Sequence, residues 1–392
     1  MRHDNGTMTS SGTLTQSSGQ IPVGSDRAAP SSARRRLQLV LAGLWVLDGV
    51  LKLQPFMFTK DFAPMTLGAA SDGAPFWLAD PINWVQKIIV NHPVGPMVVF
   101  ALAELVIGFA IAYRPTVKYG LIACICWVPF LWFFAEGLGG MTAQSGPFSG
   151  APGASILYGV LAVLLWPTER SGPGTGTGVG TGAGIGTGTG SGAGTRTGTS
   201  EATRFVGTRA AKLVWLVLWG LLAVLSFLPH NTAPDAISDT IENNVSGTPL
   251  WYTGLLNHAA DWTRGRGAEV SITLGVLLVL VALSVLVNDR RVVRAGLVLS
   301  IVIAAVIWVL GEGLGMPFMG MATDPDTGPL LAVIAVVFWP VAKKLTAEAT
   351  ENAADDRAAA PAPTAVAGTT TTTTTSNSTT KSPSTDEEGS VA

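Results

Sequence analysis

The sequence contains few charged residues and very little cysteine, histidine or tyrosine. Only 13% of its 392 residues are charged, and it has two cysteines, four histidines and four tyrosines. Two cysteines are too few to hold an iron–sulfur cluster. The chain also has no CxxCH haem motif and no dinucleotide-binding glycine motif in a strand-to-helix setting. We expect no flavin, haem or iron–sulfur site, so a redox role would need a partner that carries the cofactor.

The scarcity of charge accompanies long apolar runs. Mean hydropathy is +0.41, and several runs reach the roughly 18 to 20 residues that cross a hydrocarbon layer of about 30 Å. Basic residues stand beside these runs instead of forming one large patch, which argues against nucleic acid as a partner. Cys124 and Cys126 point about 200° apart on a helix, so we interpret them as packing residues. The composition predicts a multi-pass protein of the cell membrane, with the lipid bilayer as its surroundings.

Eight apolar segments have the composition of membrane spans. They cover residues 37–55, 95–113, 119–138, 153–167, 210–229, 268–287, 295–313 and 328–342. If the chain alternates across the membrane, the short basic clusters all fall on one side, as cytoplasmic loops require; Arg264 and Arg266 are the exceptions. The fold class expected is therefore an all-α membrane protein with eight transmembrane helices, arranged as two tandem four-helix bundles with both termini cytoplasmic.

Low-complexity segments separate these bundles. A Gly/Thr alternation within 169–208 is too poor in apolar side chains to pack and predicts a cytoplasmic linker. The polar segment 1–36 and the Thr-rich tail 345–392 are predicted to be disordered and cytoplasmic. The membrane units are then residues 37–168 and 209–344.

The two units share an ordered series of matches. WVLDGVLKLQP at 45–55 matches WGLLAVLSFLP at 219–229, and GAPFW at 73–77 matches GTPLW at 247–251. Asn-His occurs in both outer loops, and Trp-Pro closes both units. Such a series predicts a tandem duplication. Tryptophans in the long outer loops, 56–94 and 230–267, suit segments that lie at the membrane surface.

The sequence Glu-Gly-Leu-Gly occurs in both units. Glu136 and Glu312 each lie 18 residues beyond a basic residue at the inner boundary, which places them about 27 Å away, near the outer interface. One reading is structural: each glutamate accepts a hydrogen bond from a tryptophan one turn back, Trp132 or Trp308. The other is a ligand or proton site at the outer face, with His92 and His258 as partners. One His/Glu pair per unit is too few for a metal site, so no metal is expected.

Two carboxyls fall near mid-membrane. Asp48 and Glu104 lie about 18 and 15 Å from the inner boundary by the same count, and intramembrane acids are candidates for function. Lys52 follows Asp48 by four residues, the favourable order for a helical ion pair, and can also reach toward Glu136. The second unit has no equivalent acids or lysine, so a polar centre is expected in the first half alone. It either fixes helix register or forms a functional site.

The pattern Gly49 to Lys52, followed by LQPFMF within a four-span unit, resembles the DoxX-like superfamily, which includes the DoxD subunit of thiosulfate:quinone oxidoreductase and the methylamine-utilisation protein MauE. The resemblance implies a four-helix bundle over 37–167. For some members it implies quinone-linked redox chemistry, and for others a role in assembly. The second copy has Ala223 and Ser226 at the matching places.

Three functions follow as hypotheses. The first bundle binds a quinone against Trp45 and Trp132, with Lys52 or Glu136 at its polar head and a redox partner supplying electrons. Alternatively, the bundles form a non-catalytic scaffold or assembly factor that holds another membrane protein. A small-solute transporter is the third hypothesis, and the acids confined to one half argue against it.

Overall fold

Apolar runs of this length form helices because a helix satisfies its backbone hydrogen-bonding groups within one segment. The computed structural model describes residues 32–167, 207–287 and 289–339, and every regular element in these ranges is helical. The all-α class is thereby confirmed for this part of the chain. The predictions for residues 1–31, for nearly all of the linker and for the tail fall outside the described residues.

The first half is built from four helices with a surface segment after the first of them. The main helices are α1 (Ser32–Leu51), α4 (Val94–Ala112), α5 (Val117–Phe134) and α6 (Ala154–Leu164). Between α1 and α4 lie η1 (Pro55–Phe58), η2 (Pro64–Gly68), α2 (Ala69–Ser71) and α3 (Phe76–Asn91). The shorter turns η3 (Arg114–Thr116), η4 (Leu138–Ala143) and η5 (Pro147–Ser149) join the remaining helices.

The second half follows the same order. Its main helices are α8 (Gly207–Ser226), α11 (Gly267–Ser284), α12 (Arg290–Val306) and α13 (Thr327–Val337), with α9 (Ala236–Asn243) and α10 (Leu250–Thr263) between the first two. Helix α12 continues into η6 (Ile307–Gly311), and η7 (Gly313–Gly315) and η8 (Pro317–Met319) lead toward α13. The contacting pairs α1 with α4, α4 with α5 and α5 with α6 have counterparts in α8 with α11, α11 with α12 and α12 with α13.

Each of the eight predicted spans overlaps a helix of the described residues, but the helices differ in length. Five segments are long and apolar enough to cross a membrane: Val94–Ala112, Arg114–Phe134, Arg209–Ser226, Gly267–Ser284 and Arg290–Gly311. Helices α6 and α13 have 11 residues each, which corresponds to about 16 Å of rise, half of the hydrocarbon thickness. Helix α1 is long enough, but its first turns carry three arginines.

Helix α1 begins at Ser32, earlier than the start at residue 37 expected from the sequence, and its arginines have structural roles. Arg35 donates to the carbonyl of Ile111 at 3.1 Å and also to that of Ala112, at the end of α4. Arg34 donates to the carbonyl of Trp166. The last carbonyls of a helix have no hydrogen-bond donor within the helix. These arginines therefore donate to carbonyls that would otherwise be unsatisfied.

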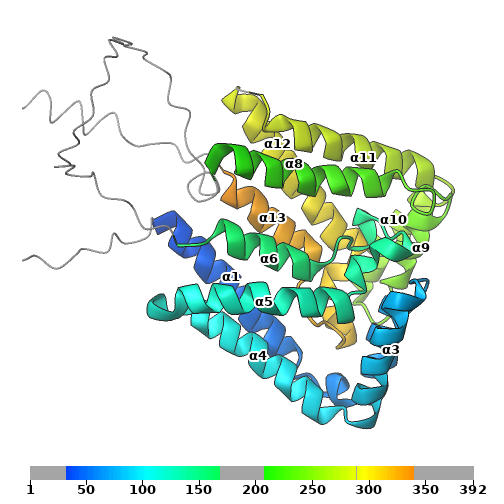
Figure 1. Cartoon of the computed structure of the whole chain (residues 1–392). Coiled ribbons are helices and arrows are strands. Elements are labelled where there is room, and N and C mark those ends of the chain that lie inside the picture. Colours follow the sequence, from blue (N-terminus) through cyan, green and yellow to red (C-terminus); the bar gives the residue numbers. More distant parts are fainter. Residues whose placement is uncertain (1–31, 168–206, 288, 340–392) are drawn as a thin grey trace, which may run out of the picture. The chain divides into compact units, whose positions relative to one another are not determined.

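The two halves pack against each other through their short helices. Helix α6 contacts α13, and η5 contacts both α8 and η6 (Figure 1). One buried apolar cluster includes residues of both halves, among them Trp45, Leu121, Trp215 and Leu297. A second, smaller cluster around Met57, Leu78 and Met97 fills the space beneath α3. The larger cluster is therefore continuous across the boundary between the two halves.

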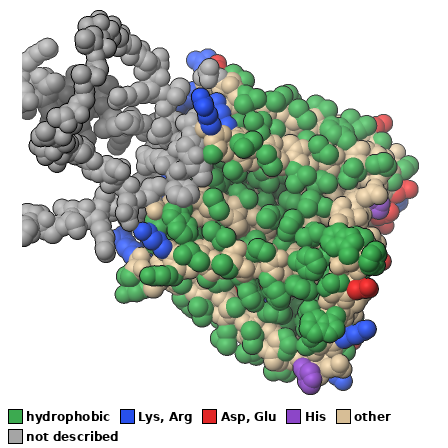
Figure 2. All heavy atoms as spheres, in the orientation of Figure 1, with side chains coloured by type: hydrophobic (Ala, Val, Ile, Leu, Met, Phe, Trp, Pro, Cys, Tyr) green, Lys and Arg blue, Asp and Glu red, His purple; other side chains and the backbone are tan. Residues whose placement is uncertain are grey.

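Polar and apolar surfaces are separated along the helices. Helices α1 and α8 begin, and α6 and α13 end, on the same side, at the left of Figure 1. Lys and Arg side chains gather near that side in Figure 2, acidic and histidine side chains gather mainly at the opposite end, and a broad hydrophobic belt lies between. The exposed tryptophans of α3 and α10 are Trp77, Trp84, Trp251 and Trp262. A belt of this kind is what a bilayer covers.

Candidate functional site

The buried lysine of α1 forms its ion pair with α4. The Lys52 ammonium lies 2.9 Å from the Glu104 carboxylate, and the Glu104 side chain is fully buried. Gly49 permits this approach, because a Cβ there would lie 2.7 Å from the Leu105 side chain and 2.9 Å from the carbonyl of Ala101. Gly49 thus serves close helix packing that brings Lys52 to Glu104.

The expected pairing of Lys52 with Asp48 is wrong. Asp48 is buried, forms no ion pair with Lys52, and its Oδ1 has no hydrogen-bond partner. It lies near Tyr158 of α6 as well as near the Lys52 charge, and the Tyr158 ring packs on Trp45 at 4.5 Å between centroids. Lys52, just beyond the end of α1, forms its ion pair with Glu104 of α4. Four-residue spacing on a helix permits a pair but does not compel one.

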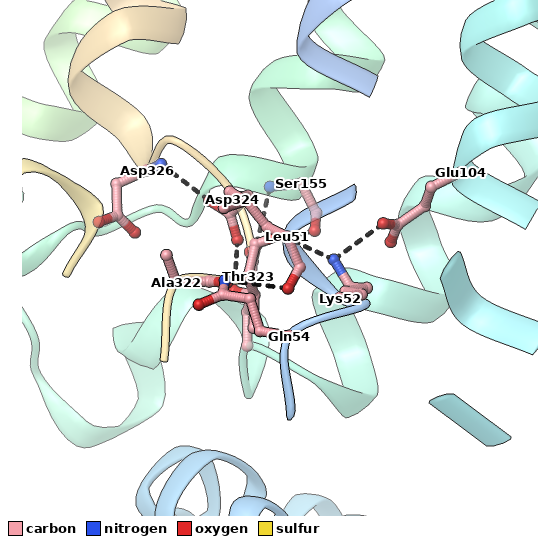
Figure 3. A network of polar contacts seen from close by, with 10 residues as sticks. Leu51, Lys52, Gln54, Glu104, Ser155, Ala322, Thr323, Asp324 and Asp326 are labelled. Atoms are coloured by element: carbon pink, nitrogen blue, oxygen red, sulfur yellow. Dashed lines mark hydrogen bonds and ion pairs between the residues drawn. The ribbon is translucent and has the colours of Figure 1, made fainter. Parts of the chain in front are cut away.

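A loop of the second half completes the polar centre. The carbonyl of Thr323 accepts from Lys52 Nζ at 2.9 Å, and the carbonyl of Ala322 accepts from Gln54 Nε2 at 3.1 Å (Figure 3). Asp324 follows in the same loop. The expectation that a polar centre belongs to the first half alone is therefore wrong, because α13 packs beside α6 and carries its preceding loop onto the end of α1.

The loop is held in shape by its own polar groups. Asp324 Oδ1 accepts from the backbone N–H of Asp326 at 2.8 Å, and Oδ2 accepts from the Thr323 hydroxyl at 2.8 Å. Asp326 lies outside the expected spans and is only partly exposed. Desolvation, with Asp324 and Glu312 nearby, raises the pKa of the Asp326 carboxyl well above its usual range. The turn therefore presents Asp324 in a fixed orientation.

The duplicated glutamates bind the start of the next helix. Glu136 Oε1 accepts from the backbone N–H of Ser155 at 2.8 Å and from its hydroxyl at 2.7 Å. Glu312 accepts from the N–H and the hydroxyl of Thr327 and, at 2.9 Å, from the N–H of Gly328. Free N–H groups at a helix start favour a carboxylate. The glutamates thus link the end of α5 to α6, and the end of η6 to α13.

The tryptophans expected as donors to these glutamates bond elsewhere or not at all. Trp132 Nε1 donates to the carbonyl of Pro152 at 2.8 Å, and Trp308 Nε1 is buried without a partner. The glycines of the motif have a clear role: Gly137 has φ of 54° and Gly313 has φ of 58°, a left-handed conformation that glycine adopts without strain. They end the helix and turn the chain so that the glutamate faces the following helix.

A pocket of about 120 Å³ adjoins the polar centre. Its walls are mostly apolar and come from η2, α3, α4, α5 and the segment before η2: Phe62, Leu67, Val85, Ile89, Met97, Phe100, Phe130, Leu131 and Phe134. Its polar lining consists of Lys52, Thr66, Glu136, Ser155, Thr323 and Asp324. Lys52 and Glu136, which the sequence singled out, therefore share one pocket with two residues of the second half.

Other candidates lie away from this pocket. Trp45 is buried against Tyr158, and neither Trp45 nor Trp132 belongs to the lining. His92 is an exposed residue that caps α3, His258 is exposed on α10, and Glu312 is bonded to the start of α13. Within the described ranges, no three His, Cys, Asp or Glu side chains come together as a metal site would require.

Sequence reasoning missed the contribution of Thr323, Asp324 and Tyr158. A signal for the loop was present: Asp324 and Asp326 flank a proline in a short connection between two apolar segments. Acids in such a connection are compatible with an exposed turn as well. The loop's position over Lys52 depends on how the second half packs against the first.

No protein-family model, curated protein or solved structure matches the chain. The resemblance to the DoxX-like superfamily stays a prediction, and the functional argument rests on the residues of the pocket.

Proposed function

We propose that this protein is a multi-pass membrane protein of DoxX-like type that binds a lipophilic carrier such as a quinone in the pocket lined by Lys52, Glu136 and Asp324. In this proposal, a membrane partner with its own redox cofactor exchanges electrons with the bound carrier. The observation that carries the proposal is an aromatic and aliphatic pocket whose polar end holds Lys52, Glu136 and Asp324. A molecule with an apolar body and a small polar ring has the matching distribution of groups.

The size and lining of the pocket fit a single ring. Apolar protein cavities of about 150 Å³ bind benzene, and the pocket of about 120 Å³ has a similar volume. Phe100 and Phe130, with ring centroids 5.9 Å apart, offer aromatic surface for stacking. Aliphatic residues of α3 and α4 line the remaining wall and suit an alkyl tail. The residues present therefore fit a quinone head at the polar end.

Bound quinone supplies two-electron chemistry that this chain's side chains lack. The chain's own groups bind and orient the head and hold protons. Lys52 is kept in place by Glu104 and by the carbonyl of Thr323, so its remaining N–H is aimed by two fixed contacts. Glu136 and Asp324 are carboxyls on opposite halves that line the same pocket and are suited to accept protons from a bound head.

The proposal is tested by binding of a short-tailed benzoquinone to the purified full-length protein in lipid nanodiscs. We expect saturable binding that Phe130→Ala and Lys52→Met weaken. Ser226→Ala is the matched control, because Ser226 stands at the Lys52 position of the second half and bonds to the Leu222 carbonyl in its own helix. The proposal is wrong if binding is absent in the wild type or is the same in all variants, while thermal unfolding verifies that each variant is folded.

The arrangement in the membrane is part of the proposal. All eight main helices cross or enter the bilayer, both termini are cytoplasmic, and the short helices α6 and α13 lie in the interior of the assembly. The buried character of α6 and α13 supports this arrangement, since most of their residues are covered by the longer helices. A helix with about 16 Å of rise does not have to span the whole hydrocarbon layer when protein surrounds it.

A scaffold or assembly factor is the second candidate. The exposed tryptophans on α3 and α10 favour it: Trp84 is 64% and Trp251 67% exposed. Such residues anchor a helix at the bilayer interface and also form protein contacts. Purification in mild detergent followed by mass spectrometry distinguishes the candidates. A stoichiometric protein that is lost in a Trp84→Ala and Trp251→Ala variant supports the scaffold, whereas a co-purifying quinone supports the pocket. A small-solute transporter has no observation in its favour.

A further inference from the structure

Most hydrogen-bond donors that line the pocket already donate to acceptors of the protein. Three hydroxyls line it, and each donates to the protein: Thr66 to the Phe62 carbonyl at 2.8 Å, Ser155 to Glu136 at 2.7 Å, and Thr323 to Asp324 at 2.8 Å. Lys52 faces the Glu104 carboxylate and the Thr323 carbonyl, each at 2.9 Å. An ammonium has three N–H groups, so Lys52 keeps one at most for a ligand.

Acceptors, by contrast, are not all satisfied. Glu136 Oε2 is buried and has no hydrogen-bond partner, although Oε1 of the same group accepts two hydrogen bonds. Each oxygen of Asp324 accepts one hydrogen bond from the loop, and a carboxylate oxygen has capacity for a second. The polar end is thus rich in acceptors from both halves and poor in donors.

This imbalance distinguishes the two forms of a quinone. The oxidised form presents two carbonyl oxygens, which only accept hydrogen bonds, whereas the reduced form presents two hydroxyls, which donate. A carbonyl oxygen placed against a desolvated carboxylate leaves both acceptors unsatisfied, and buried unsatisfied polar groups are unfavourable. A hydroxyl in the same place satisfies the carboxylate with a charge-assisted hydrogen bond.

We propose that the pocket selects the reduced, hydroxyl-bearing form of its ligand, with Glu136 of the first half and Asp324 of the second half as the two acceptors. This inference rests on the proposed function, since it concerns the same site and ligand class. It assigns the second half a direct role: its loop supplies an acceptor that the first half lacks, on a turn anchored to Lys52 through Thr323. Asp324 is then a specificity-determining residue.

The test compares both redox forms of one probe. A short-tailed benzoquinone and its hydroquinone are titrated separately, without oxygen, into full-length protein in nanodiscs, and heat of binding is recorded. We expect the hydroquinone to bind at least about tenfold more tightly, the ratio that one charge-assisted hydrogen bond provides. Glu136→Gln and Asp324→Asn keep the side-chain shape and replace an acceptor oxygen by an N–H₂ donor, so each variant should lower this preference and the double variant should lose most of it.

Asp72→Asn is the matched control, because Asp72 is an exposed acid outside the pocket, and it should keep the wild-type ratio. Equal binding of both forms, or tighter binding of the quinone, overturns the inference and leaves the proposed function standing. Binding of neither form overturns both. A preference that survives Glu136→Gln and Asp324→Asn overturns the assignment of the acceptors. Glu136 also bonds to the start of α6, so if its variant does not fold, Asp324→Asn still decides.

Discussion

Lys52 at the end of α1 and Glu104 in the middle of α4 form an ion pair of 2.9 Å in the protein interior, and a backbone carbonyl from the other half of the chain binds the same ammonium. A lysine with these two partners cannot move without disturbing both the α1–α4 contact and the loop before α13. The two halves are therefore joined at the site where the pocket has its polar end.

Replacing one partner of this ion pair should destabilise the protein more than replacing both partners together. Lys52→Met and Glu104→Leu singly leave a buried charge without its partner, which costs about 3 to 5 kcal/mol. The double variant leaves no such charge and should lose much less than the sum. Unfolding of the purified protein in mixed micelles with increasing SDS measures these free energies. Additive losses in the double variant would contradict a direct pairing between the two side chains.

Gly49 should not tolerate a larger side chain. An added Cβ would lie 2.7 Å from the Leu105 side chain and 2.9 Å from the Ala101 carbonyl, so Gly49→Ala should push α1 away from α4 and destabilise the protein by about 1 to 3 kcal/mol. Gly43→Ala in the same helix is the control, because nothing lies within 4 Å of its added Cβ. That variant should be neutral or slightly stabilising through helix propensity. Equal effects of both changes would show that α1 and α4 are not closely packed at Gly49.

Loss of the Glu312 carboxylate should weaken the start of α13. Glu312→Ala leaves the buried N–H groups of Thr327 and Gly328 without their acceptor, and an unsatisfied buried group costs about 1 to 3 kcal/mol. Glu269→Ala, at an exposed acid in the first turn of α11, should change stability by less than about 0.5 kcal/mol. Hydrogen exchange adds a local readout: protection of the first turn of α13 should fall in Glu312→Ala. Unchanged protection there would contradict the capping role.

The orientation in the membrane can be tested with single cysteines. In a background with Cys124→Ala and Cys126→Ala, Lys60→Cys should react with a membrane-impermeant maleimide in intact cells. Arg290→Cys should react only after permeabilisation, because the positive-inside rule predicts that the basic clusters are cytoplasmic. Both positions are exposed in the structure. The reverse pattern would invert the topology, and labelling of both from outside would rule out an arrangement in which they lie on opposite sides of the membrane.

The sequence predicts the helices of this protein well, because each apolar run must satisfy its own backbone in a membrane and has only helix available to do so. Glu136 and Glu312 also lie at equivalent places after the third main helix of their halves, as the repeated Glu-Gly-Leu-Gly sequence predicts. Positions along a helix axis follow from counting residues. This count predicts that Lys52 and Glu136 are neighbours in depth, and both line the pocket.

Partners across helices cannot be counted in this way. Asp48 and Glu104 were both within reach of Lys52 in depth, and the choice between them depends on the rotation of α1 and on the close approach that Gly49 permits. Thr323 is more distant still in sequence. Its carbonyl meets Lys52 because α13 packs on α6, a contact between halves that no periodicity encodes. Apolar patterning determined which segments are helical, while side-chain packing between them decided which polar groups share a site.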